Sequence, residues 1–219
     1  MQRDDQLKAR ITQFLRSFTV HAHAQAPQHT AAVALAITDT GHGANLASLP
    51  QHTHWSRDAA LILTRRAAHL RNHAGQWALP GGRMDGTESA EQAALRELNE
   101  EVGLALDASC ILGRLDDFAT RSGFVITPVV VWAGAAENLQ ANPAEVASIH
   151  RIALEEFLRS DAPMLEPLEG SSEPVLRMPV GDRWIAAPTA AFLYQFRELC
   201  LLGRPTRVAH FEQPRFAWK

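Results

Sequence analysis

The stretch GRMDGTESAEQAALRELNEEVGL, residues 82–104, decides the fold of this chain. Thr87 has a hydroxyl that can cap the start of a helix, and Gly103 can end the helix in a left-handed conformation. The apolar positions between them suit one buried face. The stretch therefore predicts a helix over residues 88–102, preceded by a structured loop over residues 66–86 that contains several glycines.

Three glutamates of this predicted helix share one face. Glu97, Glu100 and Glu101 stand at positions i, i+3 and i+4, where like charges repel one another. The cluster becomes favourable when a hard divalent cation such as Mg²⁺ or Mn²⁺ joins the carboxylates to phosphate oxygens. Arg96 can pair with Glu88 and hold the cluster in place. The pattern predicts a metal site with these five residues in catalytic roles.

The glycines before the helix suit the same chemistry. The sequence PGG at 80–82 lets the backbone approach a metal or a phosphate closely, so Gly81 and Gly82 are candidates for substrate binding and Gly82 also for the metal. The alternative is an ordinary solvated acidic helix face, because most runs of charged residues mark exposed helix surface. The fixed spacing of glycine, arginine and glutamates across the whole stretch favours the metal site.

With these residues, the stretch resembles the Nudix box, and no position of that pattern is missing. The resemblance implies an α/β fold of the Nudix type, an α/β/α sandwich with a mixed central sheet and a catalytic loop–helix–loop. It implies metal binding by Glu97, Glu100 and Glu101, supported by Glu88 and Arg96. The implied reaction is attack of water on a nucleoside diphosphate linked to a further moiety.

The segment before the box, ILTRRAAHLRNHAGQWALPGG at 62–82, resembles the coenzyme A diphosphatase branch of this family. RSGF at 121–124 and NPAEV at 142–146 look like the same branch. The branch usually has phenylalanine where this chain has Leu79, and that change removes an aromatic ring. The branch often has a Trp-Gly step before the last helix, whereas Trp184 here has no glycine beside it.

Three arginines and one glutamate extend the candidate site. Arg66, Arg71 and Arg121 flank the acidic helix in the sequence, and arginine forks suit phosphate oxygens. The alternative for each arginine is an exposed ion pair that contributes little. Glu145, in the NPAEV match, is a candidate catalytic carboxylate, with an exposed loop glutamate as the alternative. The general base is left open between Glu97 and Glu145.

The rest of the chain predicts one Nudix domain with extensions. Residues 1–27 should form an amphipathic helix over 4–18 and a loop, residues 28–203 the domain, and residues 204–219 a C-terminal tail. Short strands and a final helix alternate without strict βαβ order, which indicates a mixed sheet with helices on both faces. Residues 39–57 look like a long loop. A hairpin is expected around Gly181–Asp182.

Composition excludes several partners. Lys and Arg total 21 against 24 Asp and Glu, giving a net charge of −3, so nucleic acid is not an expected partner. The longest apolar run is too short to span a bilayer. Cys110 and Cys200 look like buried free thiols of a reducing compartment, which predicts a cytoplasmic protein. The histidine pairs lack the further ligands of a zinc site. A homodimer is left open.

Three functions follow as hypotheses. The first is Mg²⁺- or Mn²⁺-dependent hydrolysis of coenzyme A or acyl-coenzyme A to 3′,5′-ADP and (acyl-)4′-phosphopantetheine. The second is a broader diphosphatase acting on ADP-ribose or NADH, which the missing phenylalanine at position 79 and the altered entry to the last helix keep open. The third is a ligand sensor without catalysis, which has no chemical need for all three helix glutamates.

Overall fold

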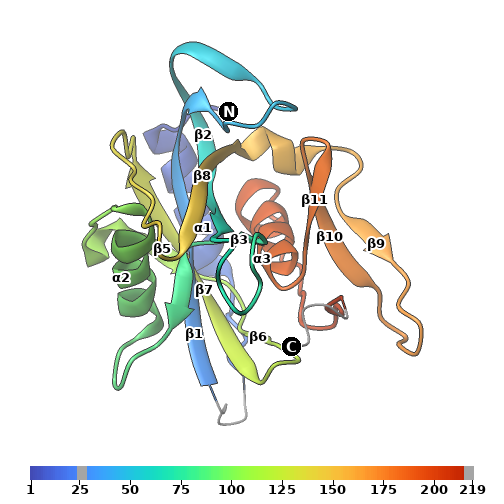
Figure 1. The fold of residues 1–219 in the computed structure, drawn as a ribbon. Helices are drawn as coiled ribbons and strands as arrows, with labels where there is room; N and C mark the ends of the chain where they lie inside the picture. Colours follow the sequence, from blue (N-terminus) through green and yellow to red (C-terminus); the bar gives the residue numbers. More distant parts are fainter. Residues whose placement is uncertain (24–28, 215–219) are drawn as a thin grey trace.

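A computed structural model describes residues 1–23 and 29–214 of the protein, and its main sheet is mixed. β1 (His29–Gly43) lies at its centre, antiparallel to β2 (Gln51–Arg66) and parallel to β7 (Phe124–Gly134) (Figure 1). The path runs β3–β2–β1–β7–β5. The other strands of this sheet are β3 (Trp77–Ala78), β4 (Gly81–Arg83), β5 (Ile111–Arg114), β6 (Phe118–Ala119) and β8 (Val146–Ala153).

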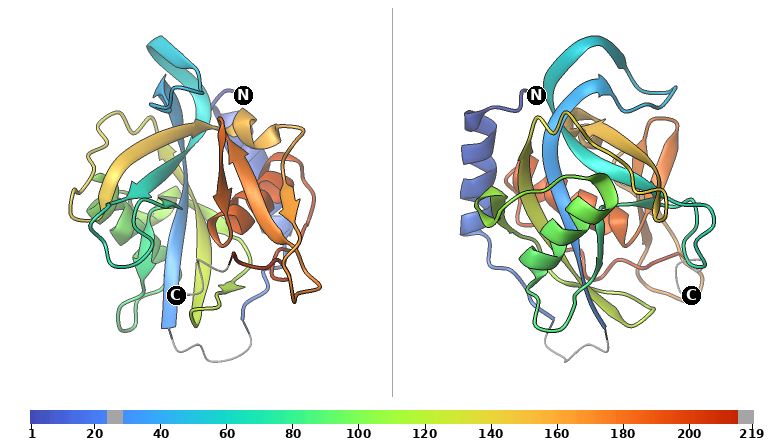
Figure 2. Two further views of the ribbon diagram at one scale, coloured as in Figure 1. Left: turned by 45° about the vertical axis from the view of Figure 1, so that its right-hand side comes forward. Right: turned by 60° about the vertical axis from the view of Figure 1, so that its left-hand side comes forward.

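The two faces of the sheet follow from the alternation of side chains along β1. Ala32, Ala34 and Ala36 pack with the apolar face of α2 (Ala90–Val102). Leu35 and Ile37 belong to the core on the other face, with α1 (Asp5–Ser17) and α3 (Thr189–Phe196) (Figure 2). Because successive residues of a strand point to opposite faces, small side chains let α2 approach closely while large ones fill the wider core.

A second sheet of three strands covers α3. It is formed by β9 (Met164–Glu166), β10 (Val175–Val180) and β11 (Arg183–Ala186), in the order β11–β10–β9. Three short helical segments complete the elements. These are the 3₁₀ helices η1 (Ala108–Cys110) and η2 (Leu154–Leu158), and the π-helical segment η3 (Arg197–Leu201), which continues α3. Both β11 and β3 are edge strands.

Buried Asp116 ties the ends of the described chain to the domain. Its carboxylate accepts hydrogen bonds from the backbone N–H of His21 at 2.7 Å, from Gln195 Nε2 at 2.7 Å and from Arg207 Nη1 at 2.6 Å. Gln195 belongs to α3 and Arg207 to the segment after it. The N-terminal segment, α3 and the C-terminal segment therefore meet at one carboxylate.

The structure corrects two sequence predictions. Residues 39–57 do not form a loop: β1 and β2 continue as a twisted antiparallel pair as far as Gly43 and Gln51, with irregular register beyond Asp39. Histidines, threonines and glycines hid these strand ends because the ends carry few apolar side chains. The cap of α2 is Ser89, not Thr87, so Glu88 precedes the helix.

Other predicted elements are confirmed. The predicted helix over 4–18 is α1, the hairpin around Gly181–Asp182 joins β10 to β11, and a final helix follows. The loop at 66–86 contains only the short β3 and β4. Residues 24–28 and 215–219, parts of the predicted terminal segments, lie outside the described residues. Within the described chain, every helix is too short or too polar to cross a membrane.

Candidate metal centre and substrate cleft

Capping at both ends fixes the position of α2. The Ser89 side chain accepts a hydrogen bond from the backbone of Gln92, whose side chain in turn accepts one from the backbone of Ser89. At the other end Gly103 has φ of 70°, and its N–H donates to Asn99. Paired caps of this kind satisfy the orphan groups of the helix termini, so the helix presents its side chains in a fixed register.

The glutamates of α2 separate into buried and exposed positions. Glu97 and Glu101, one turn apart, are 8% and 3% exposed and point toward the sheet. The side chain of Glu100 is half exposed and pairs with Arg96, with 2.9 Å between Arg96 Nη1 and Glu100 Oε2. The structure thus brings Glu97 and Glu101 together and leaves Glu100 outside their cluster.

Glu145 provides the third carboxylate of the cluster from the segment before β8. Ligand oxygens of Glu97, Glu101 and Glu145 all lie within 4.8 Å of one another. The backbone N–H of Asn142 donates to Glu101 O at 2.9 Å, and the N–H of Gln140 donates to Val102 O at 2.9 Å. These bonds fasten the loop that carries Glu145 to the last turn of α2.

Burial and mutual repulsion perturb the cluster. Burial, followed by the charges of Glu97 and Glu145, raises the pKa of Glu101 to about 8, although the Arg66 guanidinium and the Gly81 N–H oppose the change. Burial is also the main cause that raises the pKa of Glu97. Two buried carboxylates and a partly buried third at this separation suit a hard divalent cation, which takes oxygen ligands and relieves the repulsion.

The absence of side chains at positions 81 and 82 makes room for the cluster. A Cβ on Gly82 would lie 2.2 Å from Glu97 Oε1, and a Cβ on Gly81 would lie 2.4 Å from Ala32 O of the paired strand. Glycine is therefore required at 82 by a carboxylate of the cluster and at 81 by the backbone of β1.

Arg96 holds the loop before the helix against the carboxylates. Its Nε and Nη2 donate to the two oxygens of Glu88, each at 3.0 Å, as the sequence predicted. Nη1 donates to Glu97 Oε1 at 2.9 Å, and Nη2 also donates to Arg83 O at 2.9 Å. The Arg96 guanidinium holds the pKa of Glu88 below its usual range. One guanidinium thus joins the loop to the helix through a bidentate pair.

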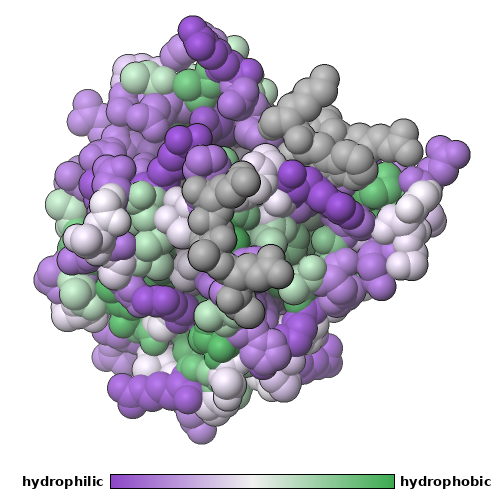
Figure 3. Space-filling view, turned by 90° about the horizontal axis from the view of Figure 1, so that it is seen from below, coloured by the Kyte–Doolittle hydropathy of each residue, from purple (hydrophilic) through white to green (hydrophobic). Residues whose placement is uncertain are grey.

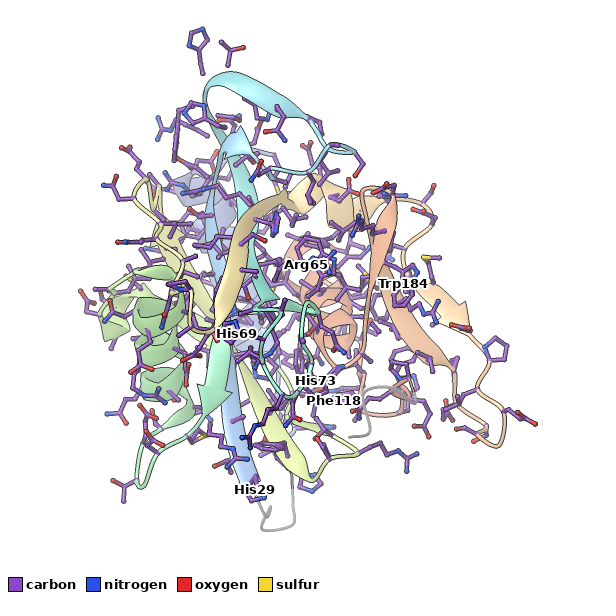
Figure 4. The ribbon with its side chains drawn as sticks, viewed as in Figure 1. His29, Arg65, His69, His73, Phe118 and Trp184 are labelled. Atoms are coloured by element: carbon purple, nitrogen blue, oxygen red, sulfur yellow. The ribbon has the colours of Figure 1, made fainter. Side chains whose placement is uncertain are left out.

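A cleft of about 570 Å³ opens beside the cluster. Gly82 and Arg66 line it, and the Nε of Arg66 is buried with no partner among the described residues. His29, His73, Arg83 and Phe124 also line it, with the Arg83 guanidinium 5.0 Å from the centre of the Phe124 ring. Figure 4 labels His29 at the lower end of β1 and His73 in the loop before β3. Seen from below, hydrophobic and hydrophilic residues are interspersed on this end of the molecule (Figure 3).

The predicted substrate residues do not all reach this cleft. Arg66, together with Gly82, lines it, but Arg71 is exposed in the loop between β2 and β3 and is not among the lining residues. Arg121 forms an ion pair with Glu212, as the ion-pair alternative expected, while its neighbours Thr120 and Ser122 line the cleft. The Leu79 side chain is buried in the core, so phenylalanine is not missing from the cleft wall.

Sequence reasoning missed the cations that flank the predicted ones. Arg83 directly follows the glycines, and Arg65 precedes Arg66 on β2. Arg83 forms no ion pair with a carboxylate in the part of the chain that the structure describes. Position beside Gly82, a predicted substrate-binding glycine, was the available signal for Arg83. No signal in the sequence pointed to Arg65, because the second sheet lies close to it only in the three-dimensional structure.

Comparisons with known proteins agree on the family. The family model of the NUDIX domain matches residues 53–176. A curated relative from Yersinia enterocolitica named "Uncharacterized Nudix hydrolase NudL" is 43% identical over 103 residues, which is 47% of this chain and 53% of the relative. A relative of the same name from Photorhabdus laumondii is 43% identical over 99 residues, 45% of this chain and 53% of its own.

The chain spans about half the length of these curated relatives. Among solved structures, a MutT/nudix family protein from Enterococcus faecalis is similar with a TM-score of 0.46 and 20% identity, over 75% of this chain and 52% of that one. The family model covers more than half of the chain and includes the whole of α2. This chain belongs to the Nudix family.

Proposed function

We propose that this protein hydrolyses the diphosphate linkage of a nucleoside diphosphate derivative and depends on Mg²⁺ or Mn²⁺. The observation that carries the proposal is the cluster of buried Glu97 and Glu101 with partly buried Glu145, beside a cleft lined by Arg66 and Gly82. These three carboxylates would hold the cation. A sensor without catalysis has no need for such a strained arrangement, in which the pKa of Glu101 is raised to about 8.

The residues around the cluster have separable tasks. When bound, the cation supplies neutralisation of phosphate charge and acidifies the attacking water. Arg96 positions Glu97 and the loop at Glu88, while the missing side chain of Gly82 leaves room for the Glu97 carboxylate. Arg66 offers a guanidinium to the diphosphate from the cleft wall. Glu97 and Glu145 are the carboxylates available to accept the proton of the water.

For the substrate we propose coenzyme A or an acyl-coenzyme A. The match of residues 62–82 to the coenzyme A diphosphatase branch supports this choice, and the buried position of Leu79 removes the objection that a stacking ring is lost from the cleft. The cleft offers both cations and apolar surface from Trp77 and Phe124, which suits a ligand with a nucleotide at one end and a long, partly apolar arm at the other.

A kinetic panel of coenzyme A, dephospho-coenzyme A, ADP-ribose and NADH, with each metal and with EDTA, tests this function. We expect hydrolysis only with added metal, and kcat/KM for coenzyme A at least about tenfold above that for ADP-ribose. Activity that persists in EDTA would contradict the metal. A preference for ADP-ribose or NADH would replace coenzyme A with the broader diphosphatase function.

Variants of single glutamates separate the cluster from the surface. Glu101→Gln should lower kcat by about 10²-fold or more because it removes one anionic ligand. Glu100→Gln should lower kcat less, since its carboxylate lies outside the cluster. Exposed Glu137 provides the matched control, and Glu137→Gln should keep the wild-type rate. Equal rates in all three variants would refute the assignment of the metal centre.

A further inference from the structure

A second cavity, of about 410 Å³, lies between the main sheet and the β10–β11 hairpin. Arg65 and Trp77 line it from the main sheet, and Arg183 and Trp184 line it from the hairpin. Figure 4 labels Arg65 and Trp184 on its two sides. The cavity shares Gln76, Trp77, Pro188 and Thr189 with the substrate cleft. The cavity and the cleft are therefore neighbours.

Two arginines of the cavity have no ion-pair partner among the described residues. Arg65 Nη1 donates to Gly75 O at 2.8 Å, and its guanidinium lies 4.2 Å from the centre of the Trp77 ring. Burial lowers the pKa of Arg65, and the nearby charge of Arg183 lowers it further. Within residues 1–23 and 29–214, neither arginine forms an ion pair with a carboxylate. Two guanidinium groups that line one cavity without an ion-paired carboxylate favour an anionic ligand.

Two further features of the cavity suit an anionic ligand with a flat ring. Pro188 and Thr189 begin α3, and no side chain caps the N-terminus of that helix. Free N–H groups at a helix N-terminus add to the attraction for an anion. Trp184 is 39% exposed and offers a ring face for a flat group, although the Arg177 guanidinium lies 3.8 Å from its centre on one side. Exposed Asp182 is the one carboxylate among the described lining residues.

We propose that this cavity is the site for a phosphate monoester carried on the ribose of the substrate, held between Arg65 and Arg183. The inference rests on the proposed function and adds to it the group that selects the substrate. Arg66 lines the cleft and Arg65 lines the cavity, and the pairing register of β2 with β8 shifts between them. Two neighbouring arginines thus serve two phosphates, the diphosphate and the monoester. A 3′-phosphate, as in coenzyme A, and a 2′-phosphate, as in NADPH, share this chemistry.

Calorimetric binding of 3′,5′-ADP, 2′,5′-ADP and 5′-AMP to the full chain tests the site without requiring catalysis. The wild type should bind 3′,5′-ADP at least about tenfold more tightly than 5′-AMP, because a monoester between two guanidinium groups gains charge-assisted hydrogen bonds. Arg183→Gln should remove most of that preference. Arg57→Gln, an exposed arginine on the same strand as Arg65, should keep it. Asp182→Asn should strengthen it, since an opposing charge is lost.

The outcomes separate the site from the function. Equal affinity for 3′,5′-ADP and 5′-AMP, or a preference unchanged in Arg183→Gln, would overturn the site. A preference for 2′,5′-ADP that is lost in Arg183→Gln supports the site and assigns it to a 2′-phosphate. If the binding results hold while none of the four diphosphates is hydrolysed, the site stands and the proposed function falls. With hydrolysis, Arg183→Gln should lower the ratio of kcat/KM for coenzyme A over dephospho-coenzyme A about tenfold.

Discussion

Two adjacent glycines offer a sharp test of how the cluster is built. Gly81→Ala and Gly82→Ala add the same methyl group one residue apart on β4, yet the added atoms meet different neighbours. At 82 the Cβ would lie 2.2 Å from Glu97 Oε1, the far end of a side chain. At 81 it would lie 2.4 Å from Ala32 O and 2.7 Å from Val33 Cα, both backbone atoms of the strand paired with β4. The first change should affect catalysis and the second should affect stability.

The magnitudes follow from the contacts. In Gly82→Ala, the Glu97 carboxylate must move by about 1 Å to restore van der Waals contact, and a misplacement of that size lowers kcat by about 10²-fold. Its melting temperature should change little because a side-chain tip can yield. In Gly81→Ala, two strands must separate, which costs about 1–3 kcal/mol and lowers the melting temperature by about 2–10 °C.

Kinetics with coenzyme A and thermal unfolding in EDTA would measure the two effects separately. Activity should be expressed per folded molecule at a temperature below both transitions. The reasoning would be refuted if Gly82→Ala kept kcat within about threefold of the wild type, or if it lost as much thermal stability as Gly81→Ala.

Two other predictions follow from buried carboxylates. The folded pKa of Glu101, about 8, lies above its ordinary 4.5, so its contribution to stability is complete below pH 4.5 and is lost as pH rises through 8. In urea titrations, metal-free Glu101→Gln should therefore have the same free energy of unfolding as the wild type near pH 5. At pH 8 it should be more stable than the wild type, by about 4 kcal/mol at most. A larger difference at pH 5 than at pH 8 would contradict the expected direction of the pH dependence. Asp116→Ala should cost about 3–5 kcal/mol in the same titrations because Arg207 and Gln195 lose their acceptor, with kcat per folded molecule unchanged.

The sequence predicted α2 and the Arg96–Glu88 contact well because both depend on local spacing. Arg96 and Glu88 are eight residues apart, and their ion pair follows from the helix and the turn before it. Glu97 and Glu101 are one turn apart, so both can face the sheet. Spacing alone could not separate them from Glu100, since burial depends on which side of the helix meets β1 and β4.

Contacts between distant segments were less accessible from the sequence. Glu145 was a candidate, but its place beside Glu101 depends on hydrogen bonds between its loop and the end of α2. Arg71 is close in the sequence to residues that line the cleft, yet it lies on an exposed loop outside the cleft. Arg183 and Trp184 approach the main sheet only because α3 and the second sheet pack beside it. Local patterns do not encode such approaches, and tertiary packing decides them.

The fastening of the Glu145 loop to α2 has a thermodynamic consequence. Asn142 and Gln140 bond to carbonyls of the last helical turn, so helix and loop move as one body and the three carboxylates are preorganised. A cation that arrives there orders little chain, and its affinity is opposed mainly by the release of protons. Calorimetry in buffers of different ionisation enthalpy should therefore find metal binding near pH 7 coupled to proton release, with little change in heat capacity from folding. The fold holds the three carboxylates in place before the metal binds. The entropy cost of ordering them is therefore part of the free energy of folding and not of metal binding or catalysis.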